Sequence, residues 1–115
     1  MSIQGDALLL RIYIGDADKT DHRTTYHAIV ELLRERGIAG ATVLRGIEGY
    51  GAKRHLHTSS ILSLSLDLPV VIEAVDRAEL IRSILPELDR MIGDGLMLVQ
   101  PIEVITHRSA APMGR

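Results

Sequence analysis

The sequence of 115 residues contains no cysteine, no tryptophan and no phenylalanine, and its only aromatic side chains are three tyrosines. Without cysteine there can be no disulfide framework, no thiolate metal site and no cysteine nucleophile, and we expect a cytoplasmic location. Three tyrosines are too few for a base-stacking platform, and a formal net charge of −2 supplies no basic field for a phosphate backbone. We therefore expect no nucleic acid among the partners.

The sequence also lacks the marks of a membrane-spanning or catalytic protein. No apolar run reaches the roughly 18 residues that a membrane-spanning helix needs. The serines after residue 58 lie in no nucleophile elbow, and no motif places a pair of carboxylates. We predict that the protein is not an enzyme, with a hydrolase or transferase hidden in a cleft as the least favoured alternative.

Apolar residues make up 46% of the chain, and their spacing alternates between strand and helix periods. The expected strands are residues 7–14, 41–47, 70–75 and 96–105. One helix is expected from about residue 21 to a stop at Gly37. A second helix begins at a capping box formed by Asp76 and Glu79, and a bend or break is expected at Pro86.

Two strand-helix-strand halves in this order predict an α+β domain of the ferredoxin-like type. Its order is βαββαβ, with an antiparallel four-stranded sheet and both helices on one face. We assign residues 1–108 to this single domain and residues 109–115 to a flexible C-terminal tail. The second and third strands are joined by a long connection, in which alternating leucines at 62–68 predict an amphipathic strand. We favour an outgrowth of the hairpin whose leucine row rests on a neighbouring subunit, and the alternative is a strand that extends its own sheet.

The predicted sheet is apolar on both faces. Leu9 and Tyr13 lie opposite the main apolar row of the first strand, and the strand at 70–75 is apolar on both sides. At about 25 cal/mol per Å², leaving such a face in water would cost on the order of 10 kcal/mol, comparable with the stability of a whole domain. We therefore predict an obligate oligomer in which other copies of the chain cover the second face.

Two glycine-rich segments are candidates for binding a small anion. Between Gly46 and Gly51, glycines let backbone amides approach a ligand closely, and Lys53 and Arg54 add positive charge. The turn at 93–95 could cradle a phosphate with its amides, or could simply end a helix and start a strand. A solvated basic turn explains the first segment as well, so both interpretations stay open.

The five histidines raise the question of a metal site. His55 and His57 are two residues apart, so on an extended chain they share a face and could bind a divalent metal with a carboxylate or a third histidine. Two histidines are an incomplete set, and a contact with an anion or an interface is the alternative. A structural or solvent-exposed role is more typical of His22, His27 and His107.

Several stretches resemble PII signal-transduction proteins. The run at 91–99, with its central glycine turn, is similar to the segment that these proteins use at the nucleotide phosphate site before their last strand. The end of the second strand lies where their long regulatory loop begins, and His107 and Arg108 lie near their basic C-terminal stretch. The run at 37–51, with the later His57 and Thr58, resembles more closely an uncharacterised PII-like group labelled a domain of unknown function.

This resemblance covers about residues 7–108 and implies a homotrimer with clefts between subunits. It further implies a regulatory protein that binds a small anionic effector, such as an adenine nucleotide, and acts on a partner such as a membrane transporter or a fluoride-channel-type protein. No other cofactor is expected. Taken together with the two glycine-rich segments and their neighbouring cations, the candidate effector residues are Arg45, Gly46, Gly49, Tyr50, Gly51, Lys53, Arg54, Gly93, Asp94, Gly95 and Arg108.

Two departures from PII proteins bear on the effector. Leu96 stands where those proteins have a lysine after the glycine turn, and the loop lacks their uridylylation-type tyrosine motif. ATP binding and uridylylation therefore do not follow from the resemblance. Effector occupancy is expected to shift residues 52–60 between ordered and disordered states. The alternative function is a CutA-like trimer that binds a divalent metal through His55 and His57.

Overall fold

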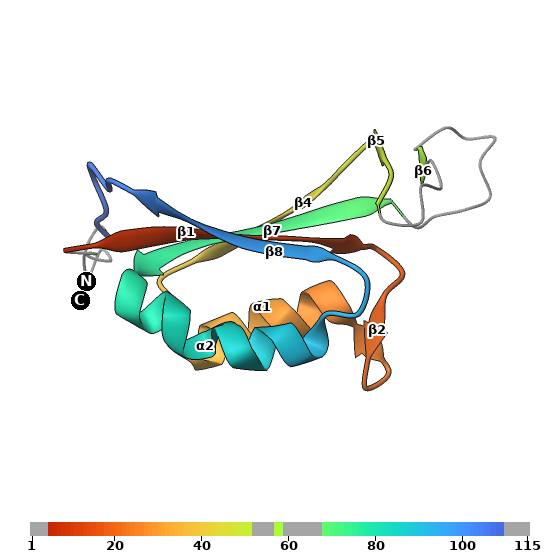
Figure 1. Cartoon of the computed structure of the whole chain (residues 1–115), viewed down its shortest axis with the longest axis horizontal. Helices are drawn as coiled ribbons and strands as arrows, with labels where there is room; N and C mark the ends of the chain where they lie inside the picture. Colours follow the sequence, from red (N-terminus) through yellow and green to blue (C-terminus); the bar gives the residue numbers. More distant parts are fainter. Residues whose placement is uncertain (1–4, 52–56, 59–67, 110–115) are drawn as a thin grey trace, which may run out of the picture.

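The computed structural model describes residues 5–51, 57–58 and 68–109 of the chain. Four strands form one sheet in the order β4-β7-β1-β8, every neighbouring pair is antiparallel, and two helices cover one face (Figure 1). The main elements are β1 (Ala7–Gly15), α1 (Thr25–Glu35), β4 (Ala41–Arg45), β7 (Pro69–Arg77), α2 (Ala78–Met91) and β8 (Leu96–Ile102). The predicted α+β, ferredoxin-like fold is confirmed.

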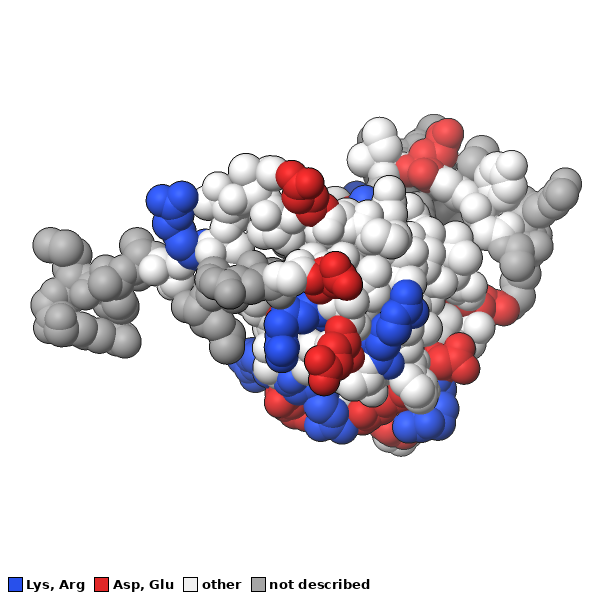
Figure 2. Space-filling model, turned by 60° about the vertical axis from the view of Figure 1, so that its left-hand side comes forward, with Lys and Arg blue, Asp and Glu red and all other residues white. Residues whose placement is uncertain are grey.

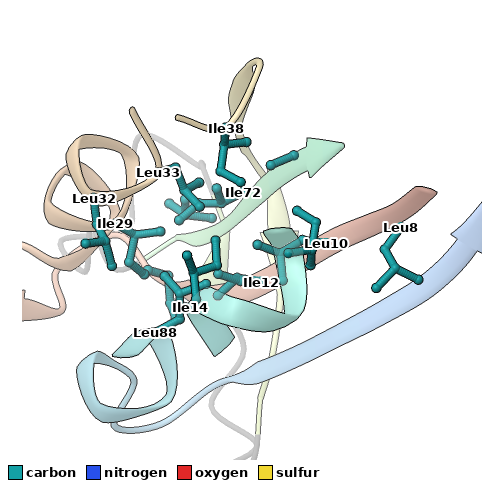
Figure 3. Close-up of a cluster of buried hydrophobic side chains, with 14 residues drawn as sticks. Leu8, Leu10, Ile12, Ile14, Ile29, Leu32, Leu33, Ile38, Ile72 and Leu88 are labelled. Atoms are coloured by element: carbon teal, nitrogen blue, oxygen red, sulfur yellow. The ribbon is translucent and has the colours of Figure 1, made fainter. Parts of the chain in front are cut away.

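The helix-covered face of the sheet carries the hydrophobic core. Leu8, Leu10, Ile12 and Ile14 alternate along β1, and each is at most 5% exposed. Figure 3 shows these side chains gathered with leucines and isoleucines of both helices. The other buried members of the cluster are Ile29, Leu32, Leu33, Ile38, Val70, Ile72, Ala74, Ile81, Ile84 and Leu88. The alternating apolar row of the sequence therefore marks the face that both helices cover.

The start of the first helix differs from the prediction. α1 begins at Thr25, and the residues before it form a short hairpin of β2 (Lys19–Thr20) and β3 (Arg23–Thr24). Asp21 and His22 make its turn with positive φ angles of 49° and 68°. Two left-handed residues cannot lie within a right-handed helix, so the predicted helix start near residue 21 is wrong.

The second helix is continuous where the sequence predicts a bend or break. α2 contains Pro86 in its interior. Pro86 is exposed, so the carbonyl that its missing N–H leaves without a partner can bond to water. On the other side of the helix, Ile81, Ile84 and Leu88 are buried, and they hold both halves of the helix against the sheet. The predicted break at Pro86 is therefore wrong.

Asp76 does not cap α2 as the capping-box pattern predicts. β7 continues to Arg77, which takes the N-cap position and makes no side-chain cap hydrogen bond. The Asp76 carboxylate is buried and instead accepts hydrogen bonds from the backbone N–H groups of Ala39 and Arg77, at 2.9 and 2.7 Å. It therefore ties the connection between α1 and β4 to the end of β7.

The remaining boundaries lie close to the predicted ones. Gly37, with a φ of 82°, ends the first helix as predicted. β4 starts at Ala41 as expected but ends at Arg45, and β8 ends at Ile102 rather than Ile105. β7 extends beyond its predicted range at both ends. Alternation of apolar side chains thus locates the four main strands, while hydrogen bonding to the neighbouring strand decides where each one ends.

The long connection between β4 and β7 is described only in part. β5 (Glu48–Gly49) and β6 (His57–Thr58) pair as a small hairpin beside the end of the sheet (Figure 1). Apart from Leu68, the amphipathic strand predicted at 62–68 lies outside the described residues, as does the predicted tail beyond residue 109. Among the described residues, neither helix combines the length and the hydrophobicity needed to cross a membrane.

The opposite face of the sheet is covered by neither α1 nor α2 (Figure 1). The strand register places on this helix-free face the side chains of Leu9, Arg11, Tyr13, Thr42, Leu44, Val71, Glu73, Val75, Leu96, Leu98 and Gln100. Two of its leucines, Leu44 and Leu96, are 50% and 55% exposed. The face is mostly apolar, as the sequence predicts, and the oligomer that would cover it stays a prediction.

Candidate functional site

At one end of the sheet, glycines lie directly against Pro69, the first residue of β7. Gly46 follows β4, and its N–H donates a 2.6 Å hydrogen bond to the carbonyl of Pro69. A Cβ at Gly46 would lie 2.7 Å from the Cγ of Pro69, and a Cβ at Gly49 would lie 3.0 Å from the same atom. A side chain at Gly46 would therefore force Pro69 to shift, and one at Gly49 would be tightly packed, so both glycines contribute to packing in addition to any contact with a ligand.

The turn between α2 and β8 contains one packed glycine and one open glycine. A Cβ at Gly95 would lie 2.6 Å from the carbonyl oxygen of Tyr13 and 3.0 Å from Cγ2 atoms of Ile14 and Ile92. A Cβ at Gly93 would meet no described atom beyond its chain neighbours within 4 Å. All three residues of the turn at 93–95 are exposed. Gly95 thus fixes how closely β8 starts against β1, and Gly93 leaves room for a ligand to approach the backbone.

The two glycine segments lie at the same end of the sheet, on opposite edges (Figure 1). Gly46 follows the edge strand β4, and Gly95 precedes the other edge strand, β8. Because β7 and β1 lie between them, these edges are about 14 Å apart at a strand spacing of about 4.8 Å. A small anion therefore cannot touch both glycine segments of one protomer.

Arg108 lies toward the other end of the sheet. β8 runs from Leu96, which pairs with Tyr13, to Ile102, which pairs with Ala7. At about 3.3 Å per residue this is a path of about 20 Å away from the glycine turn. Arg108 follows that strand and is exposed. Within one protomer the structure does not bring Arg108 to either glycine segment, so its place in the effector site stays a prediction that needs a second copy.

Arg45, the last residue of β4, is engaged in an ion pair with Asp16. Its Nε lies 3.0 Å from Oδ2 of Asp16, and its Nη2 lies 3.0 Å from Oδ1. The hydrogen bond with Asp16 raises the pKa of Arg45, and Tyr26 adds a smaller effect in the same direction. Asp16 is not among the residues predicted from the sequence to form the site. Its only signal in the sequence is the polar stretch that follows the first strand.

The other predicted ligand residues of the long connection are described only in part. Tyr50 is 68% exposed and Gly51 is also exposed, so both are open to a ligand or a partner. His57 pairs through its backbone with Gly49 in the small hairpin. Outside the described residues lie Lys53, Arg54 and His55. In the part of the chain that the structure describes, no three acidic, histidine or cysteine side chains cluster as metal ligands, and the metal pair stays a prediction.

A hollow of about 510 Å³ opens on the helix-free face, toward the end of the sheet opposite the two glycine segments. It lies between the start of β4, the end of β7 and the segment at 102–107 that follows β8. One of its lining residues, Glu73, forms a 2.7 Å ion pair with Arg11, and this hydrogen bond raises the pKa of Arg11. Figure 2 shows most charged side chains gathered over the helical lower side, with uncharged atoms prevailing above. The lining of the hollow is mostly apolar and carries two carboxylates, Glu73 and Glu103, and no lysine or arginine, which makes it a poor environment for a small anion.

Comparison with known sequences gives clear matches along most of the chain. The model of the DUF190 family, described as an uncharacterized ACR, matches residues 7–104. A UPF0166 protein of Methanocaldococcus jannaschii is 40% identical over 99 residues, which is 85% of this chain and 91% of that protein. A UPF0166 protein of Aquifex aeolicus is 35% identical over 97 residues, or 84% of this chain and 91% of that protein.

Comparison with solved structures gives CPII, described as a nitrogen regulatory PII-like protein, and GlnK. CPII from Thiomonas intermedia K12, bound to ADP and bicarbonate, superposes with a TM-score of 0.65 at 21% identity, covering 90% of this chain and 93% of that one. The GlnK–ATP complex of B. subtilis gives a TM-score of 0.50 at 15% identity, covering 88% and 85% of the two chains. At these identities the likeness establishes a shared PII-like fold.

Proposed function

The chain belongs to the DUF190 family, and we propose that it is a PII-like regulatory protein whose effector is an adenine nucleotide such as ADP. The observation that carries the proposal is the open turn at Gly93, an exposed backbone segment at the start of the last strand of a PII-like fold. The ADP bound by CPII, whose fold is similar, supports the same ligand class. Backbone amides of such a turn can bind phosphate oxygens.

The charge needed by the effector would come mainly from arginine and lysine side chains away from the turn. Leu96 follows the turn at 93–95 and supplies no cation. Arg45, Lys53, Arg54 and Arg108 are the candidates, of which the structure describes Arg45 and Arg108. A turn without its own cation favours a diphosphate over a triphosphate, because fewer negative charges must be balanced.

The proposed site lies between subunits of a homotrimer. The two glycine segments are on edges of the sheet about 14 Å apart, so one small ligand reaches both only if they come from different protomers. The helix-free face is the surface through which such protomers would pack, because it presents half-exposed leucines to water. This packing would set the β4 edge of one protomer beside the β8 edge of the next.

The proposed partner is a membrane protein such as a transporter or a fluoride-channel-type protein. Ile47 and Tyr50, in the segment after β4, are 77% and 68% exposed and would provide apolar contacts for docking. They flank Gly49, which packs on Pro69 at the proposed effector site. Effector binding would alter the affinity for the partner if its contacts differ between two positions of this segment.

Equilibrium dialysis of the purified protein with ADP tests the effector. We expect one ADP per protomer and loss of binding in Gly93→Leu, because the new side chain fills the open space at the turn. Ser83→Leu is the matched control, since it adds the same side chain to an exposed position of α2. Absence of ADP binding by the folded wild-type protein, or equal loss in both variants, contradicts the proposal.

A further inference from the structure

Asp16 contacts both ends of the connection between β4 and β7. Its carboxylate holds the guanidinium of Arg45, the last residue of β4, through two contacts of 3.0 Å. Its backbone N–H donates a 2.8 Å hydrogen bond to the carbonyl of Leu68, just before β7. The N–H of Gly46 bonds to the next carbonyl along, that of Pro69. Asp16 is thus joined to the strand ends that frame the proposed effector site.

The Asp16 carboxylate is the better-fixed partner of this ion pair. Its side chain is 20% exposed, whereas that of Arg45 is 52% exposed. The turn that carries Asp16 is closed by two contacts, since the N–H of Gly15 donates to Oδ2 of Asp18 at 3.1 Å and the N–H of Asp18 donates to the carbonyl of Gly15 at 3.3 Å. A carboxylate held in this way meets the arginine at a high effective concentration.

We propose that Asp16 is a specificity-determining residue, whose carboxylate competes with the anionic effector for Arg45. The inference rests on the proposed function, in which Arg45 is one of the cationic contacts of the effector. Asp16 occupies the Nε–Nη2 edge of this guanidinium, and an anion can take that edge only by replacing its two N–H···O contacts. An effector therefore has to bind the guanidinium of Arg45 more strongly than Asp16 does, and this requirement is a threshold for binding.

The threshold selects for phosphoryl groups. A monoanion such as acetate offers one charge and two oxygens, the same as Asp16, and gains nothing by the exchange. A terminal phosphate carries a charge of roughly −1.5 to −2 and three acceptor oxygens, so it binds the guanidinium more strongly. Asp16 thereby keeps Arg45 occupied in the presence of abundant small anions and releases it to a nucleotide phosphate.

Equilibrium dialysis of ADP with the full chain and four charge variants, three single and one double, tests the competition. Asp16→Asn keeps the shape of the side chain and removes its charge, and it should tighten ADP binding about fivefold, the scale of one ion pair. Structural damage would weaken binding instead. Glu48→Gln removes the same charge from β5, at the same end of the sheet, and should change the affinity less than about twofold because of screening. The double variant with Arg45→Gln and Asp16→Asn should bind ADP no more tightly than Arg45→Gln alone.

The outcomes separate this inference from the proposed function. Equal affinities of wild type and Asp16→Asn, or an equal gain from Glu48→Gln, overturn the competition and leave ADP as the effector. Binding by Asp16→Asn but not by wild type shows that Asp16 withholds Arg45 from ADP, and it overturns both the release of Arg45 to ADP and ADP as the effector of the wild-type protein. Absence of ADP binding by wild type and Asp16→Asn alike overturns both proposals. If the amide NMR spectrum of Asp16→Asn shows that this variant does not fold, Asp16→Ser replaces it, and the same results are expected.

Discussion

The two faces of the sheet use alternate residues of the same strands, yet only one face is covered by the chain itself. On the helix-covered face, Leu10 and Ile12 are 0% exposed. On the helix-free face, their neighbours Leu9 and Tyr13 are partly exposed, and Arg11 between them is paired with Glu73. The chain therefore completes its own core on one side and leaves an apolar surface on the other.

This difference separates what one protomer does alone from what needs more copies. The helix-covered face supplies the core of one protomer, which is formed by buried residues of both helices and of β1 and β7, together with Ile38. The helix-free face adds nothing to the core of one protomer, and its apolar side chains would be stabilised if other copies removed them from water. The proposed effector site also needs more than one copy of the chain, since its glycine segments lie on opposite edges of the sheet.

Leu10→Ala should produce the largest change and would sharpen the contrast most. Leu10 is fully buried, and removing it should lower the free energy of unfolding by about 3 kcal/mol through lost burial and a cavity. Leu9→Ala, one residue away on the helix-free face, should act mainly on assembly. Urea denaturation of both variants at one protein concentration measures the free energy of unfolding, and sedimentation of both measures their assembly. Similar unfolding losses for the two variants would break the comparison.

Gly95→Ala tests the close approach of β8 to β1. The added Cβ would lie 2.6 Å from the carbonyl oxygen of Tyr13, so the strand start must shift, at a cost of about 2 kcal/mol. Gly93→Ala is the control in the same turn, because its Cβ enters open space, and its stability should change little. Thermal unfolding of the two variants gives the difference, and equal midpoints would contradict this packing.

Glu73→Gln tests the ion pair on the helix-free face against one on the outer side of the helices. The variant leaves the charge of Arg11 without its partner on a face that would be buried between copies, so self-association should weaken about tenfold or more. Glu87→Gln removes the partner of Arg36 on the exposed helical surface and should leave association unchanged. Sedimentation equilibrium of the two variants distinguishes these results, and an equal effect would remove the special role of the helix-free face.

Glu31 should give the smallest effect, visible only through pH. The hydrogen bond from Arg23 lowers the pKa of Glu31 below 4.5 in the folded chain. A lowered folded pKa stabilises the fold at pH values above 4.5, and this contribution is lost as the pH falls through the folded value. The unfolding midpoint of Glu31→Gln should therefore lie slightly below that of wild type at pH 7 and approach it in acid. A difference between the two unfolding midpoints that widens in acid would contradict a lowered pKa of Glu31.

The sequence predicts the fold well because burial controls it. The alternation of Leu8, Leu10, Ile12 and Ile14 identifies the covered face, and each of them is buried. The errors occur where tertiary contacts override local rules. Asp76 has the pattern of a helix cap but bonds to Ala39, which belongs to the connection before β4.

The candidate site is predicted only as separate segments. The sequence selects Gly46 and Gly95, but their contacts with Pro69 and Tyr13 join strands that are far apart in the chain. Asp16 was missed for the same reason, since its partner Arg45 follows 29 residues later and no local pattern links the two. Sequence spacing identifies single residues that suit ligand binding. It does not show which of them already pair with another residue, because such pairs form only after folding.

The most direct test of this account is sedimentation equilibrium of the wild-type chain at micromolar concentration, with circular dichroism recorded on the same sample. The helix-free face predicts self-association, the resemblance to PII proteins implies that the assembly is a trimer, and structure should be lost when dilution separates the protomers. A well-folded monomer at that concentration would contradict the covering of this face by other copies and the intersubunit effector site that depends on it.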